Sequence, residues 1–358
     1  MASTIKTRIL IISDTHCAQL SKDEDAPSTY PTPPFKSPLP SADLLIHCGD
    51  LTHNGLMEQY HRTLDMMKEI DAPVKVAIAG NHDLTLDRDY ILNHVGKMGA
   101  QGAWNLAGSK DEAERIVQKA TDLWLSPEGR ARQEGVRLLG EGIHGIDLPN
   151  GAHVKVYANP YTPEFCDWAF AYEHNEDRFN PPETTLQNAS NIAAEAMPTF
   201  DEQQPIDVCI THGPPYKRLD EVIGSHEPVG CPHLLRAVMR ARPLVHCFGH
   251  IHEGWGGERV TWSQDVSDVS IRSCSLENWK NGEWKAGVAQ DGEGIEPVDV
   301  DMDEARARHG TFLDLSHDGE RGLARGSETL FLNAAVMTVR YKPLNPTWVL
   351  DLDLPARS

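Results

Sequence analysis

The chain has 358 residues, 40% of them hydrophobic, and its 53 acidic and 33 basic residues give a formal charge of −20. This length suits one large domain with insertions or two small domains. An acidic surface repels nucleic-acid backbones and anionic membranes, so we expect neither a nucleic-acid duplex nor a membrane as a partner.

The N-terminus runs directly into an apolar segment, without the basic, apolar and cleavable regions of a secretory signal. No apolar stretch reaches the roughly 20 residues of a membrane-spanning helix. The seven cysteines are an odd number, which favours free thiols in a reducing compartment over a disulfide framework. We therefore expect a cytoplasmic protein.

Continuous apolar runs predict strands that are buried on both faces, and the first five end in a polar or glycine-rich turn. In chain order the runs are 7–13, 43–49, 74–80, 206–211 and 243–249, followed by 328–339 and 347–354. Apolar residues at helical spacing predict helices over 56–70 and 231–242. Strands alternating with helices predict an α/β fold, whose sites lie at the carboxyl ends of the strands.

Three polar segments predict insertions into a single domain that spans 1–358. They cover about 21–43, 174–205 and 258–327. The second contains a short helical pattern at 191–197. The third contains the acidic run "EGIEPVDVDMDE", which is either a solvated charged loop or a Ca²⁺ ligand set, although it lacks the ligand ladder of an EF-hand.

Five polar motifs follow the predicted strands, namely "SDTH", "CGD", "AGNHD", "THGPP" and "GHIH". Each one alone is an ordinary turn sequence. Their shared position at strand carboxyl ends, however, predicts that their side chains meet at one edge of the fold. These side chains are Asp14, His16, Asp50, Asn81, His82, His212, His250 and His252.

Imidazoles, carboxylates and an amide oxygen, without an obligatory thiolate, form a ligand set for Mn²⁺, Fe or Zn²⁺ and less exclusively for Mg²⁺. About seven ligands are too many for one tetrahedral ion. A shared carboxylate would let them serve two adjacent ions, as in two-metal hydrolases.

The motifs, in this order, resemble the calcineurin-like metallophosphoesterase superfamily. The stretches "GDLTHNG", "AGNHDLTLD" and "FGHIHEGWG" are similar to its MPPED-type branch. The resemblance implies a β-sandwich of two mixed sheets flanked by helices. It also implies hydrolysis of a phosphoester by a hydroxide that two divalent cations share.

The resemblance further implies a role for each residue. The seven metal ligands are Asp14, His16 and His252 for one ion, Asn81, His212 and His250 for the other, and Asp50 as the bridge between them. His82 would be the catalytic residue, stabilising phosphoryl oxygens or protonating the leaving group. Asp83 either orients His82 or caps the following turn.

The substrate class is less constrained than the metal site. In "GDLTHNG", His53 and Asn54 stand where protein Ser/Thr phosphatases of the superfamily carry Asp and Arg. We therefore expect a small phosphodiester resembling a cyclic nucleotide, as the MPPED-type resemblance implies. The alternatives are a phosphomonoesterase or protein phosphatase, or a nucleotide-binding module with little turnover. Some MPPED-type members carry Gly at the position of His250, and its presence here favours an enzyme.

Candidate substrate contacts are Asn54, Tyr161 and Arg218, with Trp168 and Trp255 as further aromatic walls. Aromatic rings can stack on a nucleobase, but beside glycine and proline they also serve as ordinary packing. Arg218 either meets a phosphate oxygen or lies in a solvated loop.

Overall fold

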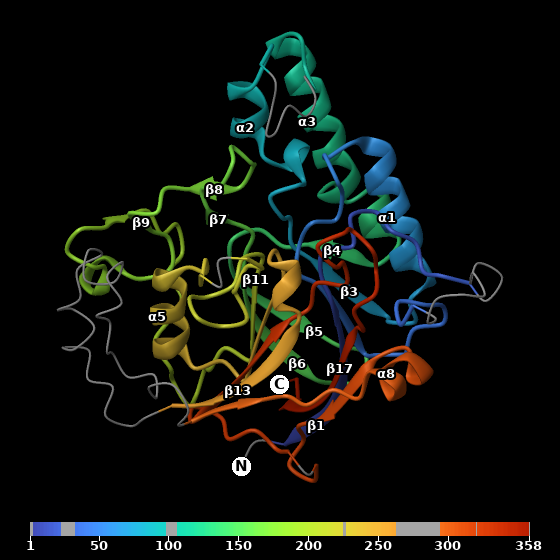
Figure 1. Cartoon of the computed structure of the whole chain (residues 1–358), viewed down its shortest axis with the longest axis vertical. Coiled ribbons are helices and arrows are strands. Elements are labelled where there is room, and N and C mark those ends of the chain that lie inside the picture. Colours follow the sequence, from blue (N-terminus) through green and yellow to red (C-terminus); the bar gives the residue numbers. More distant parts are fainter. Residues whose placement is uncertain are drawn as a thin grey trace.

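The computed structural model describes residues 3–22, 33–97, 106–224, 227–262, 294–319 and 321–357. Two large mixed sheets form its centre (Figure 1). The first has six strands in the order β15-β17-β1-β2-β3-β4, and the second has seven in the order β14-β13-β16-β12-β11-β6-β5. The predicted α/β fold and β-sandwich are thus confirmed.

The first sheet is built around β1, which pairs in parallel with β2 and antiparallel with β17. Its strands are β1 (Thr4–Ile12), β2 (Leu44–His47), β3 (Val74–Ala77), β4 (Val136–Leu138), β15 (Thr311–Asp314) and β17 (Trp348–Pro355). Parallel pairing of β1, β2, β3 and β4 places their carboxyl ends on one edge of the sheet.

In the second sheet, four neighbouring strands, β6, β11, β12 and β16, also run parallel, so their carboxyl ends share an edge. The strands are β5 (Gly142–Asp147), β6 (His153–Asn159), β11 (Val208–Thr211), β12 (Val245–Phe248), β13 (Gly256–Thr261), β14 (Ile295–Pro297) and β16 (Glu328–Asn333). Short strands flank the sheets: β7 (Thr162–Pro163), β8 (Ala171–Tyr172), β9 (Glu176–Asp177) and β10 (Ser190–Asn191).

Alternate residues of β1 face two different layers, which explains its unbroken apolar sequence. Ile9 and Ile11 pack in the core between the sheets, against residues such as Val208 of the second sheet. Leu10 and Ile12 face the opposite side and pack under helices. Burial on both faces therefore holds the polar turn after β1 at the junction of the two sheets.

Helices cover the outer face of each sheet, and α1 and α5 lie on opposite sides of the molecule (Figure 1). On the first sheet, α1 buries Tyr60 and Leu64, and α3 buries Trp124 in the same cluster. On the second, α5 buries Leu234 and Val238. The helices are α1 (Met57–Glu69), α2 (Arg88–Asn93), α3 (Lys110–Trp124), α4 (Arg130–Gln133), α5 (Pro232–Ala241) and α8 (Met302–Arg308), with 3-10 turns at Leu84–Leu86, Pro182–Thr184 and His252–Gly254.

Two predicted elements differ from the structure. The helical pattern at 191–197 forms no helix, because the backbone N–H groups of Ile192 and Met197 bond instead to carbonyls of Asp177 and Phe179. The strand predicted over 328–339 ends at Asn333, whose side chain accepts the N–H of Ala335 and turns the chain toward the first sheet.

Part of the segment 258–327, one of the three predicted insertions, belongs to the two sheets. Strands β13 and β14 extend the second sheet and β15 extends the first, while 263–293 lies outside the described residues. The acidic run is only partly a loop: it includes β14 and the start of α8, where Asp301 caps the helix and Glu304 pairs with Arg308 at 2.7 Å. These strands lie at or next to the sheet edges and are short, so their sequence carries little apolar alternation.

The other two insertions remain predictions, with some contacts now visible. Within 21–43, Phe35 and Leu39 are buried in the cluster under α1, although 23–32 lies outside the described residues.

Within the described parts of the chain, no helix combines the length and the hydropathy that crossing a bilayer requires.

Substitution of Trp348 tests how much its packing between the two sheets stabilises the fold. It is fully buried, stacks on Trp255 with ring centroids 5.2 Å apart, and donates its indole N–H to the Asn333 carbonyl. We expect Trp348→Ala to lower the free energy of unfolding by about 3–5 kcal/mol, measured by urea denaturation. Leu125→Ala, at a half-exposed side chain, is the control and should change it by less than about 0.5 kcal/mol. Equal losses in both variants would contradict this packing role.

Candidate metal centre

The turns after five strands bring all seven predicted ligands to one place, where the carboxyl ends of the two sheets meet. The first sheet contributes the residues that follow β1, β2 and β3, and the second contributes those that follow β11 and β12. The residues are Asp14, His16, Asp50, Asn81, His212, His250 and His252. No single sheet could supply this set.

Asp14, His16 and His252 converge as one group, with ligand atoms all within 4.8 Å of one another. The Nε2 atom of His252 lies 3.3 Å from Asp14 Oδ1 and 3.4 Å from His16 Nε2. This is the set that the resemblance implies for the first ion.

Asn81, His212 and His250 converge as a second group. The Asn81 Oδ1 atom lies 2.8 Å from both His212 Nε2 and His250 Nδ1. One amide oxygen and two ring nitrogens thus face a common point, as the resemblance implies for the second ion.

Asp50 lies between these groups. Its Oδ1 atom is 3.3 Å from His212 Nε2, and its Oδ2 atom is 3.6 Å from His16 Nε2. Asp14 also belongs to two candidate ligand groups, because its carboxylate lies near Asp50 and His212 as well as near His16 and His252. Two carboxylates therefore reach both sides of the cluster.

The histidine tautomers suit metal binding. The Nδ1 atoms of His16, His212 and His252 contact the backbone carbonyls of Thr52, Cys48 and Thr338 at 3.0–3.2 Å. A carbonyl only accepts, so each Nδ1 must donate, and in a neutral ring the Nε2 lone pair then points into the cluster. These donors fit the divalent cations expected from the sequence.

Close packing of the backbone holds the carboxylates in place. A Cβ atom at Gly80 would collide with the Asp50 carboxylate, and one at Gly249 would collide with that of Asp14. Asp14, Asp50 and His250 themselves adopt φ values of 53°, 53° and 68°, a strained region for residues other than glycine. Strain of this kind is typical of sites whose geometry the surrounding structure enforces.

The buried charges favour a cation. Burial lowers the pKa of His16 and of His250 to about 3, so both rings are neutral at physiological pH. Burial acts to raise the pKa of Asp14, but the hydrogen-bonded ring of His252 brings it down to about 2. Burial acts to lower the pKa of His212, yet the adjacent Asp50 carboxylate outweighs it and raises that pKa to about 9.

His82 lies beside the ligands without joining them. Its backbone N–H donates to Asp50 Oδ1 at 2.9 Å, and its Nδ1 donates to the His53 carbonyl at 2.8 Å. The ring packs on Trp168, with centroids 4.0 Å apart, and lines the cavity beside the cluster. The backbone of His82 thus hydrogen-bonds to Asp50. Because Nδ1 is already paired, Nε2 is the ring atom that can contact a ligand.

Asp83 takes neither of the two roles considered from the sequence. Its buried carboxylate accepts N–H groups from Gly80, Leu51 and Thr52, at 2.8–3.1 Å, and the Thr52 hydroxyl. It therefore ties the turn that carries Asp50 to the turn that carries Asn81.

A cavity of about 740 Å³ opens onto this centre. Trp168 lines it, as expected, and so does Tyr341, which no sequence pattern singled out. The Tyr341 ring lies 4.9 Å from the ring of His16 and 5.2 Å from that of His252. Tyr341 lies in the segment after β16 and reaches His16 and His252 only through contacts between distant parts of the chain. Local sequence patterns therefore do not single it out.

The three predicted substrate contacts do not line this cavity. Arg218 is buried and pairs with Glu258 at 3.0 Å, so it is neither a solvated loop residue nor directed at the centre. Tyr161 packs under the Arg178 guanidinium, 3.6 Å from its ring centroid. The backbone N–H of Asn54 donates to Gln59. Trp255, the further aromatic candidate, stacks on Trp348 in the core instead.

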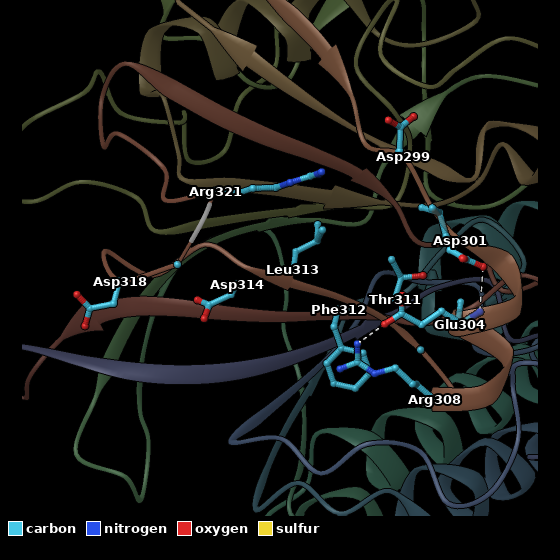
Figure 2. A pocket seen from close by; sticks show the side chains of 14 residues that line it. Asp299, Asp301, Glu304, Arg308, Thr311, Phe312, Leu313, Asp314, Asp318 and Arg321 are labelled. Atoms are coloured by element: carbon cyan, nitrogen blue, oxygen red, sulfur yellow. Dashed lines mark hydrogen bonds and ion pairs between the residues drawn. The ribbon is translucent and has the colours of Figure 1, made fainter.

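A second cavity, of about 410 Å³, lies between α8 and β15 (Figure 2). Its lining is acidic, but part of that charge is paired: Glu304 binds Arg308 at 2.7 Å, and Asp314 binds Lys6, outside the lining, at 2.6 Å. It contains none of the predicted site residues and no imidazole. The chemistry therefore belongs to the first cavity.

Cation binding should stabilise the fold through this centre. With Mn²⁺ at 100 times its dissociation constant, we expect a gain of about 2.7 kcal/mol in the free energy of unfolding, seen as a higher melting temperature. Asp50→Asn should lose most of this gain, whereas Asp318→Asn, at an exposed side chain, should keep it. An unchanged gain in Asp50→Asn would contradict the assigned ligand role.

The raised pKa of His212 predicts proton release on cation binding. At pH 7 its pKa of about 9 keeps the ring charged, so a cation must displace that proton, and affinity should rise with pH up to about 9. Calorimetry in buffers of different ionisation enthalpy should detect the release. His212→Asn should reduce it by about one proton, and exposed His317→Asn should not; no buffer dependence at pH 7 would refute the assignment.

Comparison with known proteins agrees with this geometry. The family model for the calcineurin-like phosphoesterase matches residues 7–254, more than half of the chain. Metallophosphoesterase domain-containing protein 1 of Homo sapiens is 25% identical over 354 residues, which cover 98% of this chain and 73% of that protein.

Two further relatives align with shorter parts. "Probable rhamnogalacturonate lyase C" of Emericella nidulans is 30% identical over 71% of this chain, which spans only 18% of that protein's length. A UPF0046 protein of Caenorhabditis elegans is 26% identical over 62% of this chain and 48% of its own length. The family match covers every one of the seven clustered side chains, and the chain belongs to the calcineurin-like phosphoesterase family.

Proposed function

We propose that this protein hydrolyses small phosphodiesters, resembling cyclic nucleotides, with two divalent cations bound at the seven clustered side chains. Its family supports metal-dependent hydrolysis of phosphoesters. The observation that carries the finer proposal is the position of Asp50, whose two oxygens face imidazoles on opposite sides of the cluster. Mn²⁺ is the proposed cation, with Fe, Zn²⁺ and Mg²⁺ as alternatives.

The seven side chains would hold two divalent cations, which would supply activation of a water and neutralisation of charge on the phosphoryl oxygens. The protein's own groups supply position and protons. Asp50 accepts the His82 backbone N–H and so couples the orientation of that residue to the ligand set. With Nδ1 held by the His53 carbonyl, a protonated His82 ring presents its Nε2–H to the leaving oxygen.

The lining of the cavity argues against the rival functions. Among the described residues that line it there is no lysine or arginine to grip a phosphoprotein or a doubly charged monoester. A binding module with little turnover would not need the full ligand set, and all seven side chains converge here. A small substrate, without a nucleic-acid duplex or a membrane, stays the proposed partner, and the cytoplasmic location stays a prediction.

Metal analysis and turnover together test the proposal. We expect about two equivalents of bound metal and hydrolysis of bis-p-nitrophenyl phosphate after Mn²⁺ loading. Fewer than two sites together with no turnover in any of the four metals would overturn it. A faster reaction with p-nitrophenyl phosphate would favour the phosphomonoesterase alternative.

His82→Ala separates catalysis from metal binding. Because its ring lies outside the ligand groups, we expect normal metal content but a 10²–10⁴-fold lower kcat with the diester, roughly the loss of a general acid. Asp50→Asn is the matched comparison and should lose both metal and turnover. If His82→Ala sheds metal while the remaining loaded fraction keeps its rate, the role assigned to His82 is wrong.

A further inference from the structure

The rim of the cavity beside the metal centre is apolar and solvent-exposed. Phe165, Val229, Val339 and Tyr341 line it with exposed fractions of 61%, 42%, 46% and 46%. In the described part of the chain they are four of the seven large hydrophobic side chains that are exposed. A cluster of this kind at one opening marks a surface that binds something.

Away from the metal centre, the described lining of this cavity offers no permanently charged cationic side chain. No lysine or arginine occurs among its described lining residues, whereas Glu164 and Glu253 place two carboxylates along it. A substrate that carried further phosphates or carboxylates would meet repulsion there without a compensating cation. The lining thus discriminates by charge as well as by polarity.

The rim is continuous with the reaction centre. Tyr341 contacts the rings of His16 and His252, and Trp168 packs on His82. A group esterified to a phosphorus atom held at the centre must therefore pass along these aromatic faces. The volume of about 740 Å³ lies within the range of small-molecule sites, roughly 300–1,000 Å³.

We propose that the substrate is a singly charged phosphodiester whose organic part facing this rim is uncharged and presents an apolar face, either alkyl or aromatic. This inference rests on the proposed function and names the substrate class of the same site. Apolar burial supplies the affinity that a phosphate-gripping cation supplies elsewhere. Each buried methylene should raise kcat/KM by up to about fourfold, the factor that corresponds to about 0.8 kcal/mol.

A homologous series of substrates tests the rim. Methyl, butyl, octyl and phenyl p-nitrophenyl phosphates share one leaving group, and an ω-carboxybutyl ester adds a charge at matched length. We expect kcat/KM to rise at least about tenfold from methyl to butyl and to fall for the carboxybutyl ester. Comparison of octyl with phenyl distinguishes an aliphatic from an aromatic preference, and a flat series would overturn the proposal.

Variants of the rim give the matched control. Phe165→Ser and Val339→Ser should flatten the series, because they should lower kcat/KM for the butyl and octyl esters more than for the methyl ester. Leu125→Ser removes an equally exposed apolar side chain outside the cavity and should keep the full chain-length dependence. Equal behaviour of all three variants would overturn the assignment to the rim.

Binding of unreactive analogues separates the two proposals. Calorimetry with dimethyl and dibutyl phosphate on the Mn²⁺-loaded protein should give at least about tenfold tighter binding of the dibutyl ester. If that preference is present but no diester is hydrolysed, the proposed apolar contact at the rim is supported and the proposed function is wrong. If diesters are hydrolysed without any preference for the longer alkyl ester in binding or turnover, the proposed function is supported and the rim proposal is wrong.

Discussion

The centre depends on burying two carboxylates beside one another, since Asp14 and Asp50 are almost inaccessible to solvent. Buried charges are costly unless they are paired and hydrogen-bonded. Here the backbone N–H of His250 donates to the Asp14 carboxylate, and the backbone N–H of His82 donates to the Asp50 carboxylate. Imidazoles that follow strands of both sheets surround the pair. A divalent cation that displaces the His212 proton would pair with both carboxylates at this point of the fold.

Two sheets are needed because no single turn holds enough ligands. Strands buried on both faces hold their terminal turns rigidly, and the parallel segments of each sheet open toward the same junction. Gly80 and Gly249 let the backbone approach the carboxylates closely. Asp83, buried behind the ligands, joins two of these turns through its four hydrogen bonds. Fold and metal centre are therefore parts of one packing arrangement.

The whole chain and the cavity beside the candidate metal centre are both acidic. The whole chain is strongly acidic, which favours small substrates over polyanionic partners. The cavity repeats that pattern locally with carboxylates and without lysine or arginine among its described lining. Arg218, expected from its position after "THGPPYK" to meet phosphate, is instead neutralised by Glu258 on β13. The selectivity that we propose therefore rests on apolar contact and on the candidate metal centre rather than on basic side chains.

The sequence by itself determined the main buried strands, the family and the identity of the side chains that cluster, because apolar runs ending in Asp, Asn and His are local patterns whose turns meet at one edge of parallel sheets. Only the tertiary structure decided the role of Asp83, the pairing of Arg218, the strands within 258–327 and the rim at Phe165, Val339 and Tyr341. These features arise from contacts between segments far apart in the chain, whose geometry no local periodicity encodes.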